Sequence, residues 1–344
     1  MKVAILYTGQ ANANSVRPRE VERFLTARGH DVHLIDLERF PYRRWLRVKE
    51  PFQVALRRAG MGGPEEMLRP MQEWAEIIWH KVLEGRHYDA IVCESFPHAL
   101  VLARDAGAVT LFDCPTPPVC ELMYSGEYPP ETIERLREVE RLIYGACTHV
   151  TFHWRTYVDY VREHVYDGPN LSVLDWGCHP SSRRASFATP PRMVYLGFMG
   201  GYWVNLPLLS SLSRSGATHI DVWGSPAPAG RWGLDYHGFA SLTGVLADYQ
   251  LGLVTCSKDP LRCAGFSAKH LEYIAHGLPV LAPRWRTGLE LIRGTVAYDE
   301  GDFQEVVAAL SDEGEWLKRS DEAYRQAVEL DWDVTLRPLE RMLR

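Results

Sequence analysis

The sequence has no run of about 20 apolar residues, the length that a membrane-spanning helix needs. It also lacks a signal-peptide pattern, because the apolar start MKVAILY is followed directly by the polar stretch TGQANANS. Basic charge is not in excess either: 38 Lys and Arg stand against 44 Asp and Glu, a formal net charge of -6. We therefore expect a globular protein with no transmembrane segment and no nucleic-acid partner.

The seven cysteines include no CxxC pair and follow no regular spacing. Metal sites and disulfide frameworks built on cysteine usually show such spacing, so the sequence predicts no metal site. Most of the cysteines lie beside apolar runs. Free, buried thiols in a reducing cytoplasm are the expected state.

What the sequence does contain is a repeated alternation of apolar strand-like runs and amphipathic helical stretches. The expected strands are KVAILY, DVHLIDL, YDAIVCES, AVTLFD, THVTFHW and LSVLDWG, and then MVYLGF, HIDVWG, YHGF, LGLVTC, LPVLAP and TVAYD. Alternation at this spacing is typical of parallel sheets covered by helices. It predicts the α/β class, with two Rossmann-like, doubly wound domains facing a central cleft.

The domain boundary is expected in the polar, proline-bearing segment SSRRASFATPPR, residues 181–192, which shows no periodicity. This predicts an N-terminal domain over residues 1–180 and a C-terminal domain over residues 193–315. Residues 316–344 are expected to form C-terminal helices.

The stretch FSAKHLEYIAHGLPVLAP, residues 266–283, carries the clearest functional signal. It predicts a helix that begins near Gly265, Phe266 and Ser267, at the carboxyl ends of the strands. The first amides of such a helix favour phosphate, and Lys269 adds a full charge to the same anion. Glu272, one turn on, is placed to accept hydrogen bonds from a ribose. The alternative is an ordinary surface pair of Lys and Glu three residues apart.

The segment AKHLEYIAHGLPVLAP resembles the donor-binding motif of glycosyltransferases with the two-domain GT-B fold, family 4 or "group 1". Segments around it resemble the rest of the donor domain of that family, and LDWDVTLRPLERML resembles its terminal helix, which crosses back to the N-terminal domain. The N-terminal half matches only in layout. The resemblance implies an acceptor-binding N-terminal domain and a donor-binding C-terminal domain.

The resemblance also implies roles for single residues. Lys269 is expected to contact the donor phosphates and to stabilise the leaving group, and Glu272 is expected to bind the ribose. The loop of Gly197, Gly200 and Gly201 should face the diphosphate. One position departs from the family pattern: the second Glu that retaining members carry is Ala264 here. Whether the reaction retains or inverts the sugar configuration stays open.

Candidates for the other side of the reaction lie at predicted strand ends of the N-terminal domain. If the enzyme inverts, Asp113, Glu94 or His98 could take the proton of the acceptor. Asp113 could instead shape a turn, and His98 could cap a helix. Asn12 and Asn14 are further candidates in an early loop.

Other polar and aromatic groups are not expected to have a catalytic or metal-binding role. Asp331-Trp332-Asp333 spells a DxD sequence, but Asp before a helix is an ordinary N-cap. His149 and His153 lie in a strand-like run and are not expected to converge on one ligand. His276 suits the last turn of a helix, and Tyr202-Trp203 suits packing as well as stacking.

The sequence as a whole predicts a cytoplasmic, metal-independent glycosyltransferase with no cofactor besides its nucleoside-diphosphate sugar donor. The acceptor would be a small molecule or a glycan, with a hydroxyl or amine group. Two rivals remain: a sugar-nucleotide epimerase of the same layout, and a non-catalytic protein that binds a nucleotide sugar. The nucleotide, the sugar and the oligomeric state are left open.

Overall fold

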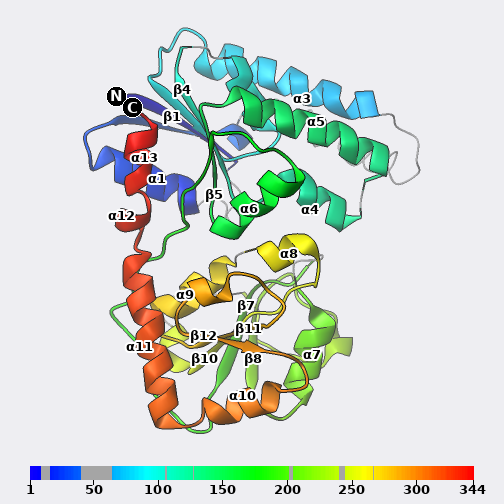
Figure 1. Cartoon of the computed structure of the whole chain (residues 1–344), viewed down its shortest axis with the longest axis vertical. Coiled ribbons are helices and arrows are strands. Elements are labelled where there is room, and N and C mark those ends of the chain that lie inside the picture. The colour runs from blue at the N-terminus through cyan, green and yellow to red at the C-terminus, as the bar shows by residue number, and fades with distance from the viewer. Residues whose placement is uncertain are drawn as a thin grey trace. The chain divides into compact units, whose positions relative to one another are not determined.

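The computed structural model describes residues 1–8, 16–39, 64–104, 107–126, 128–200, 204–239, 245–265 and 267–344. The chain divides into two compact units: unit 1 is Met1–Trp176 with Leu336–Arg344, and unit 2 is Gly177–Thr335. Each unit holds one six-stranded sheet flanked by helices (Figure 1). Every strand pair in both sheets is parallel, which confirms the predicted pair of Rossmann-like α/β units.

Unit 1 has the strand order β2-β1-β3-β4-β5-β6. Its strands are β1 (Lys2–Tyr7), β2 (Asp31–Asp36), β3 (Ala90–Cys93), β4 (Val109–Cys114), β5 (His149–Phe152) and β6 (Leu171–Val173). Its helices are α1 (Val16–Thr26), α3 (Pro64–Ile78), α4 (Pro118–Ser125), α5 (Pro130–Ala146), α6 (Arg155–His164) and α13 (Arg337–Met342). Shorter helical segments are Leu37–Arg39, Trp79–Leu83 and His98–Arg104.

Helix α1 shows how the apolar pattern produces this packing. Val21, Phe24 and Leu25 form one apolar face and are buried, and Gly29 follows the helix with a φ of 81°, a conformation that glycine adopts without strain. Helix α13, from the end of the chain, belongs to the same unit. Glu340 Oε2 of α13 lies 3.6 Å from Arg28 Nε, which follows α1, and Figure 1 shows these two helices side by side.

Unit 2 has the strand order β12-β11-β10-β7-β8-β9. Its strands are β7 (Met193–Phe198), β8 (Ile220–Ser225), β9 (Asp235–Tyr236), β10 (Leu251–Leu253), β11 (Val280–Pro283) and β12 (Thr295–Tyr298). Its helices are α7 (Leu206–Arg214), α8 (Pro260–Ala264), α9 (Ala268–Ala275), α10 (Phe303–Ala309), α11 (Glu313–Glu329) and α12 (Trp332–Thr335), and shorter helical segments are Gly230–Trp232, Leu246–Asp248 and Leu289–Leu291.

The change from one unit to the other lies at residues 176 and 177, before the predicted linker. The predicted linker, residues 181–192, is bound to unit 2. The amide of Ser181 donates to Ala275 O and the amide of Ala185 donates to His276 O. The lack of periodicity correctly indicated that residues 181–192 form no helix or strand. Backbone hydrogen bonds nevertheless attach this segment to unit 2.

All seven cysteines are free thiols, and six of them are buried. Burial raises the pKa of several, for example those of Cys93 and Cys147 to about 12. Among the helices that the structure describes, none combines the length and the apolar character needed to cross a membrane.

Candidate active site residues

The carboxyl end of β7 and the start of α9 are pressed together in unit 2. A Cβ atom added at Gly197 would lie 2.2 Å from Lys269 Cε, which no real contact allows. Gly197 also has a φ of 134°. Glycine is therefore required at position 197, near the end of β7, where the strand meets Lys269.

The Lys269 ammonium is held at this point by one aromatic residue of β7. Lys269 Nζ donates a hydrogen bond of 2.7 Å to the hydroxyl group of Tyr195 and lies 4.4 Å from the centroid of the same ring. Tyr273 of α9 then connects the strands, because its hydroxyl accepts from the amide of Leu196 and donates to Leu253 O. These bonds fix α9 against β7 and β10.

Two arginines that the sequence analysis did not select join Lys269. Arg262, in α8, and Arg286, after β11, are both buried. Both, together with Lys269, act on the thiol of Cys256: burial raises the pKa of this thiol and the three nearby cations oppose the rise. We call Lys269, Arg262 and Arg286 the cation group.

Arg286 has donors to spare within the part of the chain that the structure describes. Its Nη2 donates to Gly265 O, while its buried Nε and Nη1 atoms have no recorded hydrogen-bond partner. A buried guanidinium is costly unless an anion or several acceptors satisfy it. This point therefore suits an anionic ligand. Sequence reasoning missed Arg286 because nothing local marks an arginine after a strand as buried.

The remaining donor candidates lie around the same helix start. Ser267 is the N-cap residue of α9, but its side chain makes no capping hydrogen bond. Gly265 is buried and accepts from Arg286. The side chain of Glu272 is solvent-exposed; neighbouring protein atoms still partly desolvate its carboxyl group and raise its pKa, and Lys269 acts against this rise. Gly200 follows β7, and a Cβ there would lie 2.8 Å from Phe198 Cζ.

Several predicted residues lie outside the described part of the chain: Gly201, Phe266, Tyr202, Trp203, Asn12 and Asn14. The Ala264 position, by contrast, is described. Ala264 is the last residue of α8 and is buried.

Unit 2 also has a hollow at the carboxyl ends of its strands, and one of its lining residues is adjacent in sequence to the cation group. It is lined by residues that include Lys258, Trp285 and Asp299, and by Asn205 at the start of α7. Trp285 directly precedes Arg286. The hollow thus offers an aromatic side chain, a cation and carboxylates near the ends of β11 and β12.

Unit 1 has its own cavity at the carboxyl ends of its strands. Its lining comes from the ends of β1, β3, β4 and β5 and from Trp176, three residues after β6, and includes Tyr7, Glu94, Thr116 and His153. Polar and aromatic side chains at this edge of a parallel sheet are typical of a small-molecule site.

Asp113 lies beneath this cavity and is fully buried. Arg17 Nε donates to Asp113 Oδ2 over 2.6 Å, and Thr151 Oγ1 donates to Asp113 Oδ1 over 2.7 Å. Arg17 also donates to the carbonyl groups of Leu174 and Asp175. Burial alone would raise the pKa of Asp113, but the Arg17 charge and His153 hold it well below its usual range. An ionised, saturated and buried carboxylate suits a structural anchor better than the predicted general base.

Glu94 and His153 are two of the titratable groups that line the cavity. Burial and the negative charge of Asp113 raise the pKa of Glu94 well above its usual value, against the effect of Arg17. Glu94 Oε1 is buried and has no recorded hydrogen-bond partner among the described residues. Burial lowers the pKa of His153 to about 4, helped by Arg17. The sequence analysis did not select His153, because two histidines four residues apart in a strand, His149 and His153, are not expected to bind one ligand.

His98 is not among the residues that line the cavity. Its Nδ1 lies 3.0 Å from Ser95 Oγ, and its ring stacks on Trp74 with centroids 5.6 Å apart. It begins the short helical segment His98–Arg104. These contacts favour the capping and packing role over the predicted catalytic one.

Comparison with known proteins places the fold. No family model and no curated protein matches the sequence. Among solved structures, a sucrose-phosphate synthase from Thermosynechococcus elongatus matches 99% of this chain and 98% of its own, with a TM-score of 0.73 and 13% identity. HepE from Anabaena, solved in complex with UDP and glucose, matches 100% and 99% with a TM-score of 0.68 and 11% identity. A glycosyltransferase from Rickettsia africae matches 99% and 97% with a TM-score of 0.64 and 14% identity.

These likenesses show that the chain has the GT-B fold of two Rossmann-like units, as the resemblance in the sequence implies. At such low identity they carry the fold alone. The chemistry has to be argued from the residues of this chain.

Proposed function

We propose that this protein is a glycosyltransferase that moves a sugar from a nucleoside-diphosphate sugar to a hydroxyl or amine acceptor. The observation that carries the proposal is the cation group at the start of α9. A half-buried Lys269 and two buried arginines, one of them with spare donors, meet where helix amides also point. A diphosphate supplies the charge and the acceptor atoms that such a site needs.

The role of the cation group is to stabilise the diphosphate as it departs. Negative charge develops on the leaving group in the transition state, and fixed cations and amides stabilise it without a metal ion. Glu272, one turn into α9, would accept hydrogen bonds from the ribose. HepE was solved with UDP and glucose, so UDP is the first nucleotide to test.

The acceptor would bind in the unit 1 cavity. Glu94 is the candidate general base there, because it lines the cavity and its buried Oε1 has no recorded hydrogen-bond partner among the described residues, whereas the carboxylate of Asp113 is already bound by Arg17 and Thr151. Trp176 and Tyr7 offer apolar faces to a sugar ring or an aromatic acceptor. In a retaining enzyme, Glu94 would position the acceptor instead.

The test is a thermal-shift titration with UDP, GDP, dTDP, ADP and CDP on the wild type and on Lys269→Ala. A nucleotide at a hundred times its Kd stabilises the folded state by about 2.7 kcal/mol. Loss of a charged hydrogen bond should weaken binding at least about tenfold in Lys269→Ala. Lys318→Ala, which removes an exposed lysine of α11, is the matched control and should bind as the wild type does.

Turnover then separates the rivals. Transfer to an added acceptor, detected by mass spectrometry of the glycoside, supports the transferase. Conversion of a nucleotide sugar to its epimer without acceptor would favour the epimerase, and binding without either product would favour a sensor. If no nucleotide shifts the melting temperature, the cation group has another anion and the proposal is wrong.

A further inference from the structure

A group of histidine and aspartate side chains lies on unit 2 where β8 and β9 begin. The sequence reads His219-x-Asp221, where His219 directly precedes β8, and Asp235-x-His237, where His237 directly follows β9. Alternate residues of a strand face the same side of the sheet. Asp221 and Asp235 are paired directly across the two parallel strands, so all four side chains are brought to one face.

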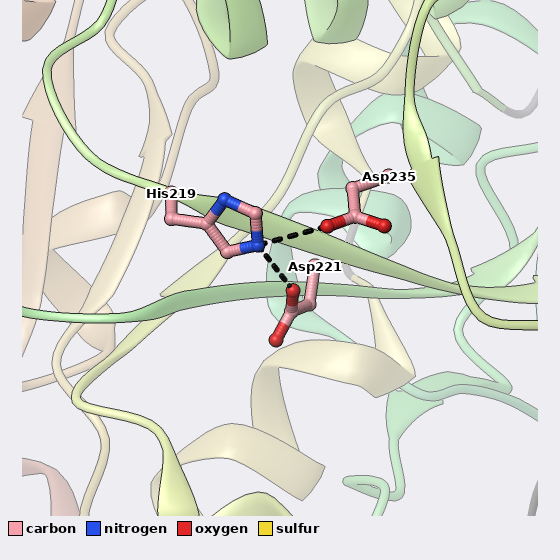
Figure 2. A group of neighbouring side chains, drawn as sticks. All are labelled: His219, Asp221 and Asp235. Carbon is pink, nitrogen blue, oxygen red and sulfur yellow. Dashed lines mark ion pairs between the residues drawn. The ribbon is translucent and has the colours of Figure 1, made fainter.

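The ring of His219 points between the two carboxyl groups (Figure 2). Its Nε2 lies 2.8 Å from Asp221 Oδ1 and 2.9 Å from Asp235 Oδ2. One ligand atom from each of these three residues lies within 4.8 Å of the other two. The group therefore offers one imidazole nitrogen and two carboxylate oxygens to a common point.

This donor set has the chemistry and nearly the spacing of a zinc site. Zinc binds His nitrogen and carboxylate oxygen at about 2.0–2.2 Å in tetrahedral geometry, which places ligand atoms roughly 3.3–3.6 Å apart. A shift of about half an ångström in the exposed side chains of His219 and Asp235 would reach that spacing. An imidazole among the ligands favours zinc or a similar transition metal over Mg²⁺ or Ca²⁺.

Neighbouring groups orient the central carboxylate, as outer partners commonly do around metal ligands. Asp221 is buried, and Arg192 Nη2 donates to its Oδ2 over 2.6 Å. His237 Nε2 lies 3.1 Å from Asp221 Oδ1, and its ring stacks on Trp223 at a centroid distance of 5.0 Å. Both carboxyl oxygens of Asp221 therefore have partners, with Oδ2 bound by Arg192 and Oδ1 turned to His219 and His237.

We propose that His219, Asp221 and Asp235 form a binding site for a zinc-type divalent cation, with a fourth position for water. The ion would fasten β9, a two-residue strand at the edge of the sheet, to β8. The site is separate from the cation group: Asp221 pairs with Val194 of β7, three residues or roughly 10 Å along that strand from Gly197, which lies against Lys269. The ion has a structural role here and takes no part in the transfer reaction.

The experiment uses the whole chain, freed of metal with a chelator and then titrated with Zn²⁺ alone. We expect one equivalent of zinc by elemental analysis and a rise in the melting temperature with zinc. Co²⁺ in place of zinc should give the visible absorption of a four-coordinate ion. Asp235→Asn and His219→Ala remove exposed ligands and should each abolish the stoichiometric binding, whereas His164→Ala, an exposed histidine of α6, should not.

Other outcomes would overturn the proposal. If the wild type takes up no zinc, or takes up the same amount in Asp235→Asn and His219→Ala, the group is a hydrogen-bonded cluster in which a protonated His219 balances the carboxylates. Both variants change exposed side chains, so folding of each can be verified by its unfolding transition before metal is added. Nucleotide binding, measured in parallel with and without chelator, keeps this test independent of the proposed transferase function.

Discussion

Each unit has a buried arginine near the carboxyl ends of its parallel strands, but the two arginines differ in their partners. In unit 1 the buried cation Arg17 meets a buried anion, Asp113, and two carbonyl groups. In unit 2 the buried cation Arg286 meets one carbonyl group and keeps two further nitrogens without a recorded partner in the described chain.

This difference separates a structural charge from a binding site. A buried ion pair with its full set of partners is neutral as a unit, and removing one member leaves an uncompensated charge. A buried cation with spare donors raises the free energy of the empty protein and lowers it again when an anion binds. Mutation should therefore change stability in unit 1 and affinity in unit 2.

The largest effect is expected for Asp113→Asn. The amide leaves Arg17 without its counter-ion, and breaking a buried pair in this way costs about 3–5 kcal/mol. Urea or thermal unfolding measures the loss, with Asp159→Asn on the exposed surface of α6 as the control. The double variant Arg17→Met, Asp113→Leu should recover part of the loss. Unchanged stability together with lost activity would return Asp113 to the general-base role that its sequence position suggested.

The sequence predicts what depends on local pattern. The strand runs were correct because each is apolar and stands between turn residues; β1 and β7 match KVAILY and MVYLGF residue for residue. The predicted strand YHGF was displaced, because β9 is the short edge strand Asp235–Tyr236 and has little apolar signal. Lys269 and Glu272 could be selected since both lie in one helix turn.

Long-range partners could not be predicted in this way. Asp113 was one of three candidate bases in the sequence, which does not show that Arg17, 96 residues earlier, binds it. Arg286 was missed for the opposite reason, since its burial depends on the packing of α8 and α9 around it. The pairing of His219-x-Asp221 with Asp235-x-His237 needed the strand register, although the alternation itself is visible in the sequence.

The next effect in size is expected for Arg286→Met. Loss of charge-assisted hydrogen bonds to the diphosphate should weaken nucleotide binding by about 1.5–3 kcal/mol, roughly tenfold or more. The stability of the empty protein should stay the same or rise, because a buried cation near Lys269 is removed. Calorimetric titration measures the nucleotide affinity, and urea unfolding measures the stability of the empty protein.

Arg284→Met, two residues away and exposed, is the matched control and should change neither the affinity nor the stability. A variant that loses stability but keeps affinity would make Arg286 a structural residue like Arg17.

The smallest effect concerns Glu94 and Asp113 of unit 1, whose contributions to stability should depend on pH in opposite directions. Burial and Asp113 raise the pKa of Glu94 in the folded protein, so its neutral form is favoured there relative to the unfolded chain. The resulting contribution to stability is complete below the ordinary Glu pKa of about 4.3 and is lost as pH rises through the raised value. Glu94→Gln cannot ionise, so its stability relative to the wild type should increase with pH above about 5, as urea unfolding would show.

Asp113, whose pKa is lowered, acts with the opposite sign, and its contribution to stability is lost as pH falls. Glu163→Gln, an exposed change on α6, should run parallel to the wild type. If Glu94→Gln also runs parallel, Glu94 is ionised in the fold and the contrast between the two carboxyl groups is not one of protonation.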